Sequence, residues 1–380
     1  MSEKVPEIRS LYRLPFSKND NPNGWVEITT FCNQKCPNCY RGCDREDMPQ
    51  VHESLEKIFT DIDELVRLRN CQIISISGGE PLLHPGLTEV VRYVSGRKLS
   101  PWLQTNALAL SDGTLRELKY AGLEGLVIRV DSLQNPGNAK SEIDLNDRRV
   151  ELARLVKQVG GLHLSFIAVV SRKNLQGIPD IIEWGRQNAS LVDFLAFIPM
   201  RQVRFREGDV VDSTDWVYLE DLCRAVGVRF PELKYASYLG SQNEAGAIKW
   251  LQSIWAVMDG RVLGYGGPKV VELFQTLHHL RKGTYAYKYG RGRSRISVPA
   301  ILAVSLLVRD VRPIARRCLK AALKNPLSLF GGAFIQTLCY IIPPGLKDRR
   351  LDLCDGCPDA MLYQGRLVPS CGLEEVKLER

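Results

Sequence analysis

The chain has 380 residues, of which 44% are apolar and 25% are charged, and its formal net charge is +8. This length can bury one large core or two smaller ones, and the composition is that of an ordinary globular enzyme. No apolar run reaches the roughly 18 residues that a membrane-spanning helix needs, and the first residues lack the apolar region of a secretory signal. These features exclude a spanning or exported protein and predict a cytoplasmic one.

The cysteines and the basic residues are both unevenly distributed. The chain has eleven cysteines, and their CxxxCxxC and CxxC groups indicate metal ligands rather than disulfides. Twelve basic residues and one acidic residue lie between positions 281 and 324, so the remainder of the chain is slightly acidic. Any attraction to anions therefore belongs to this segment.

Residues 1–23 form a polar lead-in that leaves no room for a separate peptide-binding domain. From residue 24, short apolar runs alternate with helical patterns, which is typical of stacked βα units around a parallel sheet. The expected strands cover residues 25–31, 73–77, 102–105, 126–130, 162–170 and 192–198. The expected helices cover residues 53–69, 87–94, 112–120, 148–159 and 174–187. Ligands bind at the carboxyl ends of such strands.

The first cysteine group follows the first expected strand. Cys32, Cys36 and Cys39 are separated by three and then two residues. Three thiolates so close together can hold three irons of a 4Fe–4S cluster and leave the fourth iron without a protein ligand. A zinc site is the alternative, because Cys43 completes a set of four cysteines. The spacing alone leaves both interpretations open.

A second motif, Gly78-Gly79-Glu80, follows the second expected strand. Adjacent glycines allow a ligand to approach the backbone closely, and the glutamate can pair with an ammonium group. Together, the two motifs resemble those of the radical SAM superfamily. The resemblance implies a partial (β/α)6 barrel over residues 24–205, with a 4Fe–4S cluster on Cys32, Cys36 and Cys39. It also implies that Gly78, Gly79 and Glu80 hold the methionine part of S-adenosylmethionine (SAM).

Further SAM contacts are expected at other strand ends. Thr105-Asn106 resembles the TNG motif of the superfamily, with Ala107 in place of the glycine. Asn38, before the third cysteine, and Asp131, after the fourth strand, are further candidates for SAM contacts. Ordinary turn and capping chemistry is the alternative for these polar residues.

Residues 206–345 are interpreted as a mostly helical, basic and apolar insert. Helical patterns cover residues 245–258, 270–280 and 313–324, and apolar runs cover 296–308 and 327–342. A helical cap over the barrel is one interpretation. An interface with an anionic membrane is another, and so is a pocket for a substrate with an apolar body and a phosphate head. Tyrosines among arginines at 285–293 can stack on bases, but no RNA-binding module accompanies them, so nucleic-acid binding is not expected.

Residues 346–380 contain the second cysteine group, Cys354, Cys357 and Cys371. Its spacing resembles the auxiliary-cluster domain of the molybdopterin-precursor radical SAM enzyme and, loosely, SPASM and twitch domains. A hairpin over residues 361–368 would return Cys371 to the CxxC. The resemblance implies a second cluster of the 4Fe–4S kind, with Cys339, Cys318 and Cys43 as candidates for a fourth ligand. A structural zinc ribbon is the alternative.

The resemblance implies an enzyme that cleaves SAM reductively to a 5′-deoxyadenosyl radical and abstracts hydrogen from its substrate. A flavodoxin- or ferredoxin-type protein would supply the electron. The basic and apolar insert favours a lipid-like or anionic substrate that undergoes C–C bond formation or rearrangement. A peripheral position of the enzyme on the inner membrane face is a further interpretation of this insert. Peptide or natural-product maturation is an alternative, and a non-catalytic metal-binding interaction protein is another. The sequence does not identify the catalytic side chains.

Overall fold

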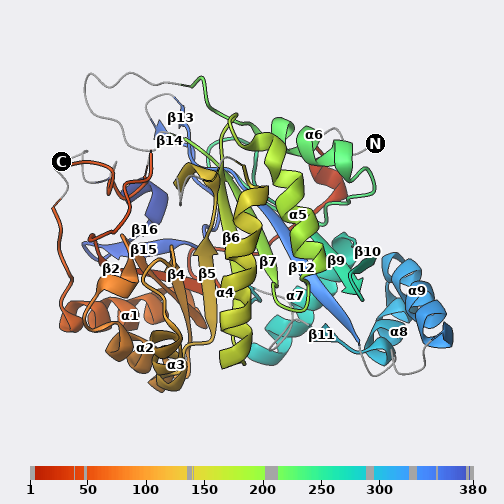
Figure 1. Ribbon diagram of the computed structural model, residues 1–380, viewed down its shortest axis with the longest axis horizontal. Helices are drawn as coiled ribbons and strands as arrows, with labels where there is room; N and C mark the ends of the chain where they lie inside the picture. Colours follow the sequence, from red (N-terminus) through yellow and green to blue (C-terminus); the bar gives the residue numbers. More distant parts are fainter. Residues whose placement is uncertain are drawn as a thin grey trace.

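The computed structural model describes residues 5–37, 39–46, 49–134, 139, 141–201, 213–287, 295–324, 332–347, 350–373 and 376. Its centre is a run of six parallel strands that pair in chain order (Figure 1). These strands are β2 (Asn23–Thr29), β3 (Ile73–Gly78), β4 (Ser100–Thr105), β5 (Gly125–Arg129), β6 (His163–Val170) and β7 (Phe194–Pro199). They confirm the six expected strands and the α/β class, a partial barrel of the (β/α)6 type.

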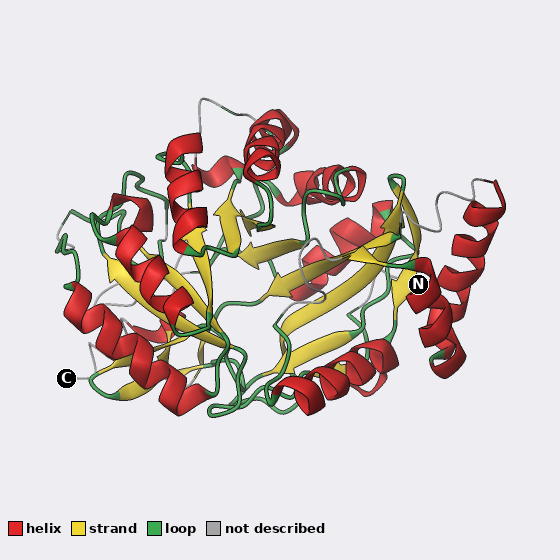
Figure 2. Cartoon of the chain, turned by 90° about the horizontal axis from the view of Figure 1, so that it is seen from below, coloured by secondary structure: helices red, strands yellow, loops and turns green. Residues whose placement is uncertain are grey.

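Helices connect the parallel strands and cover the outside of the sheet (Figure 2). They are α1 (Leu55–Arg69), α2 (Leu87–Gly96), α3 (Asp112–Ala121), α4 (Asn146–Val159) and α5 (Ile178–Gln187), close to the expected ranges. The Ser54 side chain caps the start of α1, and Asn70 ends it in the left-handed conformation. Val26 and Ile28 on β2 belong to the same buried core as Ile62 on α1. Because side chains alternate along a strand, the intervening residues of β2 point into the barrel.

The sheet continues beyond β7 with strands from the expected insert. β12 (Ala333–Ile341) pairs in parallel with β7, and β9 (Ile248–Met258) pairs in antiparallel fashion with β12. β8 (Ser237–Gly240) and β10 (Arg261–Gly266) both pair with β9, β1 (Tyr12–Arg13) pairs with β8, and β11 (Arg295–Ile296) pairs with β12. The region expected to be a mostly helical insert therefore supplies strands to the main sheet.

The helix expected over residues 245–258 is wrong, because this segment forms β9. All eleven residues of β9 are buried. A strand that is buried on both faces has no alternating pattern, so its apolar run cannot be told from a buried helix by periodicity. The turn that follows carried the missed signal. Asp259 and Gly260 both have positive φ, as in the tight turns that join antiparallel strands.

The helices expected over 270–280 and 313–324 are confirmed as α7 (Pro268–Lys282) and α9 (Arg312–Lys324). The apolar run at 296–308 contains α8 (Val298–Leu307), and α6 (Leu219–Arg229) precedes β8. α8 and α9 form a helical hairpin at the end of the molecule away from β15 and β16 (Figure 1). None of the helices in the described residues is long and apolar enough to cross a bilayer.

The C-terminal segment forms two small hairpins. β13 (Leu346–Lys347) pairs with β14 (Arg350–Leu351), and β15 (Ala360–Tyr363) pairs with β16 (Arg366–Pro369). The second hairpin confirms the strands expected on either side of the turn at Gln364 and Gly365. A short 3-10 turn, η8 (Ser370–Gly372), follows and carries Cys371. The hairpin thereby returns the chain toward the CxxC segment.

Candidate functional site

The first cysteine group lies on the loop that leaves β2, as the sequence predicts. Cys32, Cys36 and Cys39 are all partly buried. The Cys43 thiol lies within hydrogen-bonding distance of both Cys32 and Cys39, and this contact lowers the pKa of both thiols, that of Cys39 to about 6. Burial raises the pKa of Cys36 to about 11. In the part of the chain that the structure describes, no three His, Cys, Asp or Glu side chains are already set at metal-binding geometry.

Gly78 and Gly79 bring the end of β3 directly against the start of the cysteine loop. The Gly79 N–H donates to the Thr29 carbonyl at 2.7 Å, and the Glu80 N–H donates to the Phe31 carbonyl at 2.7 Å. A Cβ atom at Gly79 would lie 2.2 Å from the Phe31 carbonyl oxygen. Only glycine permits this approach, so the two motifs form one continuous backbone surface.

Glu80 is fully buried at the bottom of this surface. Its carboxylate accepts hydrogen bonds from Thr105 Oγ1 at 2.7 Å, from the Asn106 N–H at 2.7 Å and from the Leu82 N–H at 3.0 Å. Burial raises the pKa of Glu80 despite these donors. A carboxylate has about four acceptor positions, so one remains for a ligand ammonium group. Thr105 and Asn106 therefore join the site through Glu80.

Two amide side chains from neighbouring strand ends hold the cysteine loop. Asn106 Nδ2 donates to Asn33 Oδ1 at 2.7 Å, and Gln134 Nε2 donates to Gln34 Oε1 at 3.0 Å. Three strand ends therefore meet at this loop, as expected for a ligand site of a parallel barrel. The predicted contact of Asn38 with SAM lies outside the described residues.

Asp131 is fully buried and joins β5 to β6. Its two oxygens accept from the Arg129 side chain at 2.7 and 3.2 Å, from the Val169 N–H at 3.0 Å and from the Leu133 N–H at 3.1 Å. These bonds use all of its acceptor positions, so a SAM contact by Asp131 would require one of them to break. Burial lowers the pKa of Arg129, but the Asp131 carboxylate raises it further, so this guanidinium stays charged close to Cys36.

The sequence interpretation missed Arg129, which is partly buried, and a second cation, Arg41. Arg41 Nε pairs with Glu27 Oε2 at 2.6 Å, and both side chains are almost completely buried. The Tyr40 hydroxyl lies 3.5 Å from Glu27 Oε1 and 3.4 Å from Ser77 Oγ. The charged side chain of Glu27 at an inward position of β2, together with basic residues just after Cys39, was the available signal.

The second cysteine group is also brought together. Cys354 and Cys357 lie within hydrogen-bonding distance of each other, and this contact raises the pKa of Cys357. Burial and the nearby Cys357 raise the pKa of Cys371. Of the candidates for a fourth ligand, Cys339 belongs to the same buried cluster as Cys354 and Cys357. The other two lie elsewhere, since Cys318 packs within the α8–α9 core and Cys43 lies in the first loop.

Residues at the start of β2 and the end of α1 hold this second group. Asn21 Nδ2 donates to the Gly356 carbonyl at 3.0 Å, and Asn23 Nδ2 donates to the Pro358 carbonyl at 3.3 Å. Arg69, which is 1% exposed, donates to the Cys357 carbonyl at 2.7 Å. Its Nε has no hydrogen-bond partner among the described residues. The two cysteine groups therefore lie at opposite ends of β2, about 20 Å apart along the strand at roughly 3.3 Å per residue.

Polar side chains line the barrel between the two groups. Ser75 Oγ donates to Asn23 Oδ1 at 3.0 Å, and Gln104 Nε2 lies 3.5 Å from Ser75 Oγ. Asn23 Nδ2 also contacts Asp359 Oδ1 at 3.3 Å, and burial raises the pKa of Asp359 to about 6. The Tyr287 side chain also hydrogen-bonds to Asp359. A hydrogen-bonding interior thus connects the two cysteine groups.

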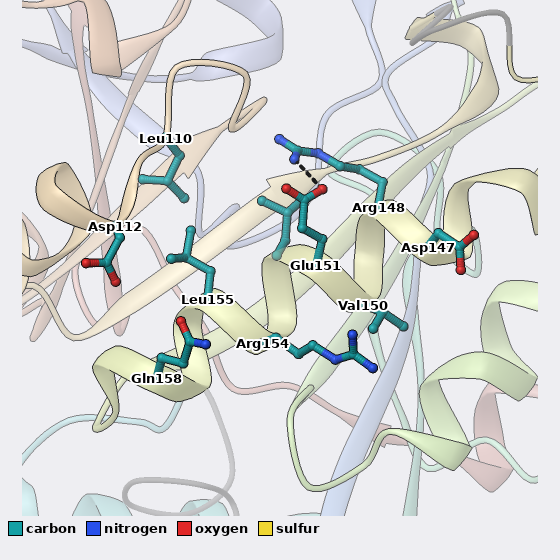
Figure 3. A pocket seen from close by; sticks show the side chains of 10 residues that line it. Leu110, Asp112, Asp147, Arg148, Val150, Glu151, Arg154, Leu155 and Gln158 are labelled. Atoms are coloured by element: carbon teal, nitrogen blue, oxygen red, sulfur yellow. Dashed lines mark hydrogen bonds and ion pairs between the residues drawn. The ribbon is translucent and has the colours of Figure 1, made fainter.

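Two outer cavities lie away from the cysteines. A cavity of about 590 Å³ lies beside α4 (Figure 3) and is lined by Leu110, Arg148, Glu151, Leu155 and their neighbours. A second, of about 780 Å³, lies between the lead-in and the start of α7. Neither is lined by a cysteine, so neither belongs to this site.

Comparison with known proteins shows which family of enzymes the first part of the chain resembles. Residues 26–185 match the family model of the Radical SAM superfamily. This range covers β2 to α5 and contains both the cysteine loop and the Gly78-Gly79-Glu80 turn. Over these residues, the chain is similar to the radical SAM superfamily of enzymes.

The curated relatives match over slightly less than half of the chain. The PqqA peptide cyclase of Bradyrhizobium diazoefficiens is 30% identical over 42% of this chain and 41% of its own length. A probable GTP 3′,8-cyclase of Methanocaldococcus jannaschii is 26% identical over 47% of this chain and 59% of its own length. The matches therefore span about half the length of these relatives. Among solved structures, Streptococcus suis SuiB bound to the precursor peptide SuiA is 16% identical over 49% of this chain and 40% of that chain, with a TM-score of 0.39.

The residues at both ends of β2 fit iron–sulfur clusters. At the first end, the pKa values of Cys32 and Cys39 are already lowered, and thiolate is the form that binds iron. At the second end, Arg69 offers a buried guanidinium with an unused Nε donor beside Cys357. Such a donor fits an anionic group better than an apolar core.

We expect Cys43→Ser to retain the iron of the first group, whereas Cys39→Ser loses it. Cys43 contacts two of the three thiols but is not part of the three-cysteine motif, so its hydroxyl replacement leaves the three thiolates in place. Iron and sulfide analysis of anaerobically reconstituted protein, in a Cys354→Ala/Cys357→Ala background, measures the first group alone. Equal loss in both variants would instead identify a four-cysteine site.

Proposed function

We propose that this chain cleaves SAM reductively at the end of β2 and uses the resulting radical to abstract hydrogen from a substrate inside the barrel. The observation that carries the proposal is the contact between the cysteine loop and the Gly78-Gly79-Glu80 turn, fixed by two backbone hydrogen bonds of 2.7 Å. A cluster and SAM bound there together supply a 5′-deoxyadenosyl radical when an electron is provided.

The residues of the chain have separate roles in this proposal. Cys32, Cys36 and Cys39 hold the cluster. Glu80 keeps one acceptor position for the amino group of SAM, while its other bonds fix Thr105 and Asn106. Arg129, charged and close to Cys36, offers a counter-charge for the cluster or for the carboxylate of SAM. A flavodoxin- or ferredoxin-type protein is the proposed electron donor.

The second cysteine group is proposed to hold an auxiliary 4Fe–4S cluster through Cys354, Cys357 and Cys371, with Cys339 as the candidate for the fourth ligand. Burial of Cys339 in the same cluster as Cys354 and Cys357 supports this choice over Cys318 and Cys43. The placement of this group at the opposite end of β2 leaves the polar interior between the two clusters for the substrate.

The proposed substrate has an anionic or polar head that enters the barrel and a lipid-like body that carries this head. Arg129 and the Ser75–Gln104 pair support a polar head, because they place charge and hydrogen-bonding groups inside the barrel. The reaction proposed is C–C bond formation or rearrangement. Peptide maturation is the second candidate, and the similarity to a PqqA peptide cyclase favours it.

The test is anaerobic reconstitution with iron and sulfide, followed by dithionite and SAM. We expect 5′-deoxyadenosine from the intact chain and none from Cys32→Ala, which also loses about four irons. The matched control, Cys71→Ala, changes a buried cysteine outside both groups and should keep both iron and product. Iron-free protein with zinc in the first group, and no 5′-deoxyadenosine, would overturn the proposal.

A further inference from the structure

The α8–α9 hairpin exposes large apolar side chains that a packed helical cap would bury. Leu306 and Leu307 at the end of α8 are 79% and 77% exposed, and Leu319 and Leu323 on α9 are 43% and 84% exposed. Isolated exposed leucines are common on protein surfaces, but four on one short hairpin are not explained by chance exposure alone. Leu307 lines the cavity between the lead-in and the start of α7, whereas Leu319 and Leu323 form an exposed apolar surface on α9.

The opposite side of the same hairpin is firmly packed. Ile314 and Cys318 on α9 and Ile301 on α8 belong to one buried cluster with Leu263 on β10. Arg317 adds a hydrogen bond of 2.8 Å to the Leu263 carbonyl. The exposed leucines are consequently not a misplaced core, because the core-facing side of both helices is already filled.

Basic side chains accompany the exposed leucines. Arg312, Arg316, Leu319 and Leu323 follow each other at intervals of four, three and four residues, so they share one face of α9. Arg316 and Lys320 are exposed, and the exposed Arg312 donates through Nε to the Ser305 carbonyl at 3.3 Å. Between Arg309 and Lys324 the only acidic residue is Asp310. Leucines on this helix face suit the acyl boundary of an anionic membrane, and exposed cations on the same face suit its headgroups.

We propose that the α8–α9 hairpin docks this enzyme on an anionic lipid bilayer. The leucines enter the boundary between headgroups and acyl chains, and Arg312, Arg316 and Lys320 bind the lipid phosphates. Charge complementarity selects this partner over a second copy of the chain, since two copies of the same hairpin would bring like charges together. The proposal concerns docking alone and does not depend on the reaction proposed for the barrel.

The test uses the full chain and vesicle flotation. Vesicles of phosphatidylcholine with phosphatidylglycerol are compared with vesicles of phosphatidylcholine alone, at low and at high salt. We expect binding to the anionic vesicles only, weakened by salt. Leu319→Glu/Leu323→Glu and Arg316→Glu/Lys320→Glu should each lower the bound fraction by more than roughly tenfold, since each removes one of the two contributions.

Matched controls separate docking from general surface effects. Val228→Glu on α6 changes an equally exposed apolar residue (72%), and Arg92→Glu/Lys98→Glu reverses two exposed charges on or next to α2. Both controls should float like the unaltered chain, and all variants should keep its circular dichroism and 5′-deoxyadenosine formation. Binding that is independent of anionic lipid, or equal losses in the controls, would overturn the proposal. Self-association that buries the leucines, detected by light scattering and abolished by Leu319→Glu/Leu323→Glu, would overturn it as well.

Discussion

Gly79→Ala is expected to lower 5′-deoxyadenosine formation by at least about a hundredfold, because small displacements of an aligned site have effects of this size. The new Cβ atom would lie 2.2 Å from the Phe31 carbonyl oxygen and 2.8 Å from that of Thr30. Both atoms belong to the backbone, so the cysteine loop has to move away from β3. The loss should appear in turnover with SAM, while the second cysteine group, at the other end of β2, is left in place.

Gly96→Ala provides the control for this substitution. Gly96 ends α2, and a Cβ atom there meets nothing within 4 Å. Alanine in a helix is favoured over glycine by roughly 0.5–1 kcal/mol, so this variant should be fully active and slightly more stable. If Gly79→Ala turned over SAM as fast as Gly96→Ala, the contact between the two motifs would not matter for the reaction.

Arg149→Met is expected to lower the free energy of unfolding by roughly 3–5 kcal/mol, the usual effect of removing one partner of a buried ion pair. Arg149 Nη2 lies 2.8 Å from Glu142 Oε2, and neither side chain is exposed. The same guanidinium donates to the Val130 and Glu142 carbonyls. Removal of Arg149 leaves a buried carboxylate without its counter-charge, which chemical denaturation should detect.

The neighbouring residue supplies the comparison. Arg148 pairs with the exposed Glu151 at 2.8 Å and donates to the Ala107 carbonyl at 3.0 Å. Exposed ion pairs and single hydrogen bonds each contribute about 1 kcal/mol, so Arg148→Met should destabilise the chain less than Arg149→Met. Arg149→Met/Glu142→Gln should recover part of the loss, because the second change removes the unpaired charge. If Arg148→Met and Arg149→Met had the same free energy of unfolding, the buried ion pair would contribute no more to stability than the exposed one.

The barrel could be predicted from the sequence because the patterns that indicate its strands and helices lie within short segments. Each βα unit has its own apolar period and its own turn, and the functional residues follow strand ends, so Cys32, Gly79 and Thr105 were found without knowledge of the packing. β9 was misread because burial on both faces removes the alternation that identifies a strand. The spacing of the cysteines is likewise a local signal.

What could not be predicted depends on contacts between distant parts of the chain. Arg69 and Asn21 hold the Cys357 segment from 288 and 336 positions away, and nothing in their own neighbourhood indicates this role. Arg129 is held near Cys36 by Asp131, which the sequence indicates as a SAM contact or a turn residue and not as a partner of an arginine. Such roles follow from the closure of the barrel, which a single sequence does not specify.

The seven residues of β2 set the distance between the two loops that carry the cysteine groups. Because a paired strand hardly stretches, the interval between the loops is set by residue count and cannot adjust to the occupant. Insertion of one residue into β2 would also turn every inward-pointing side chain beyond it outward. Molecular length, as well as chemical character, should therefore decide which compounds can touch both loops at once.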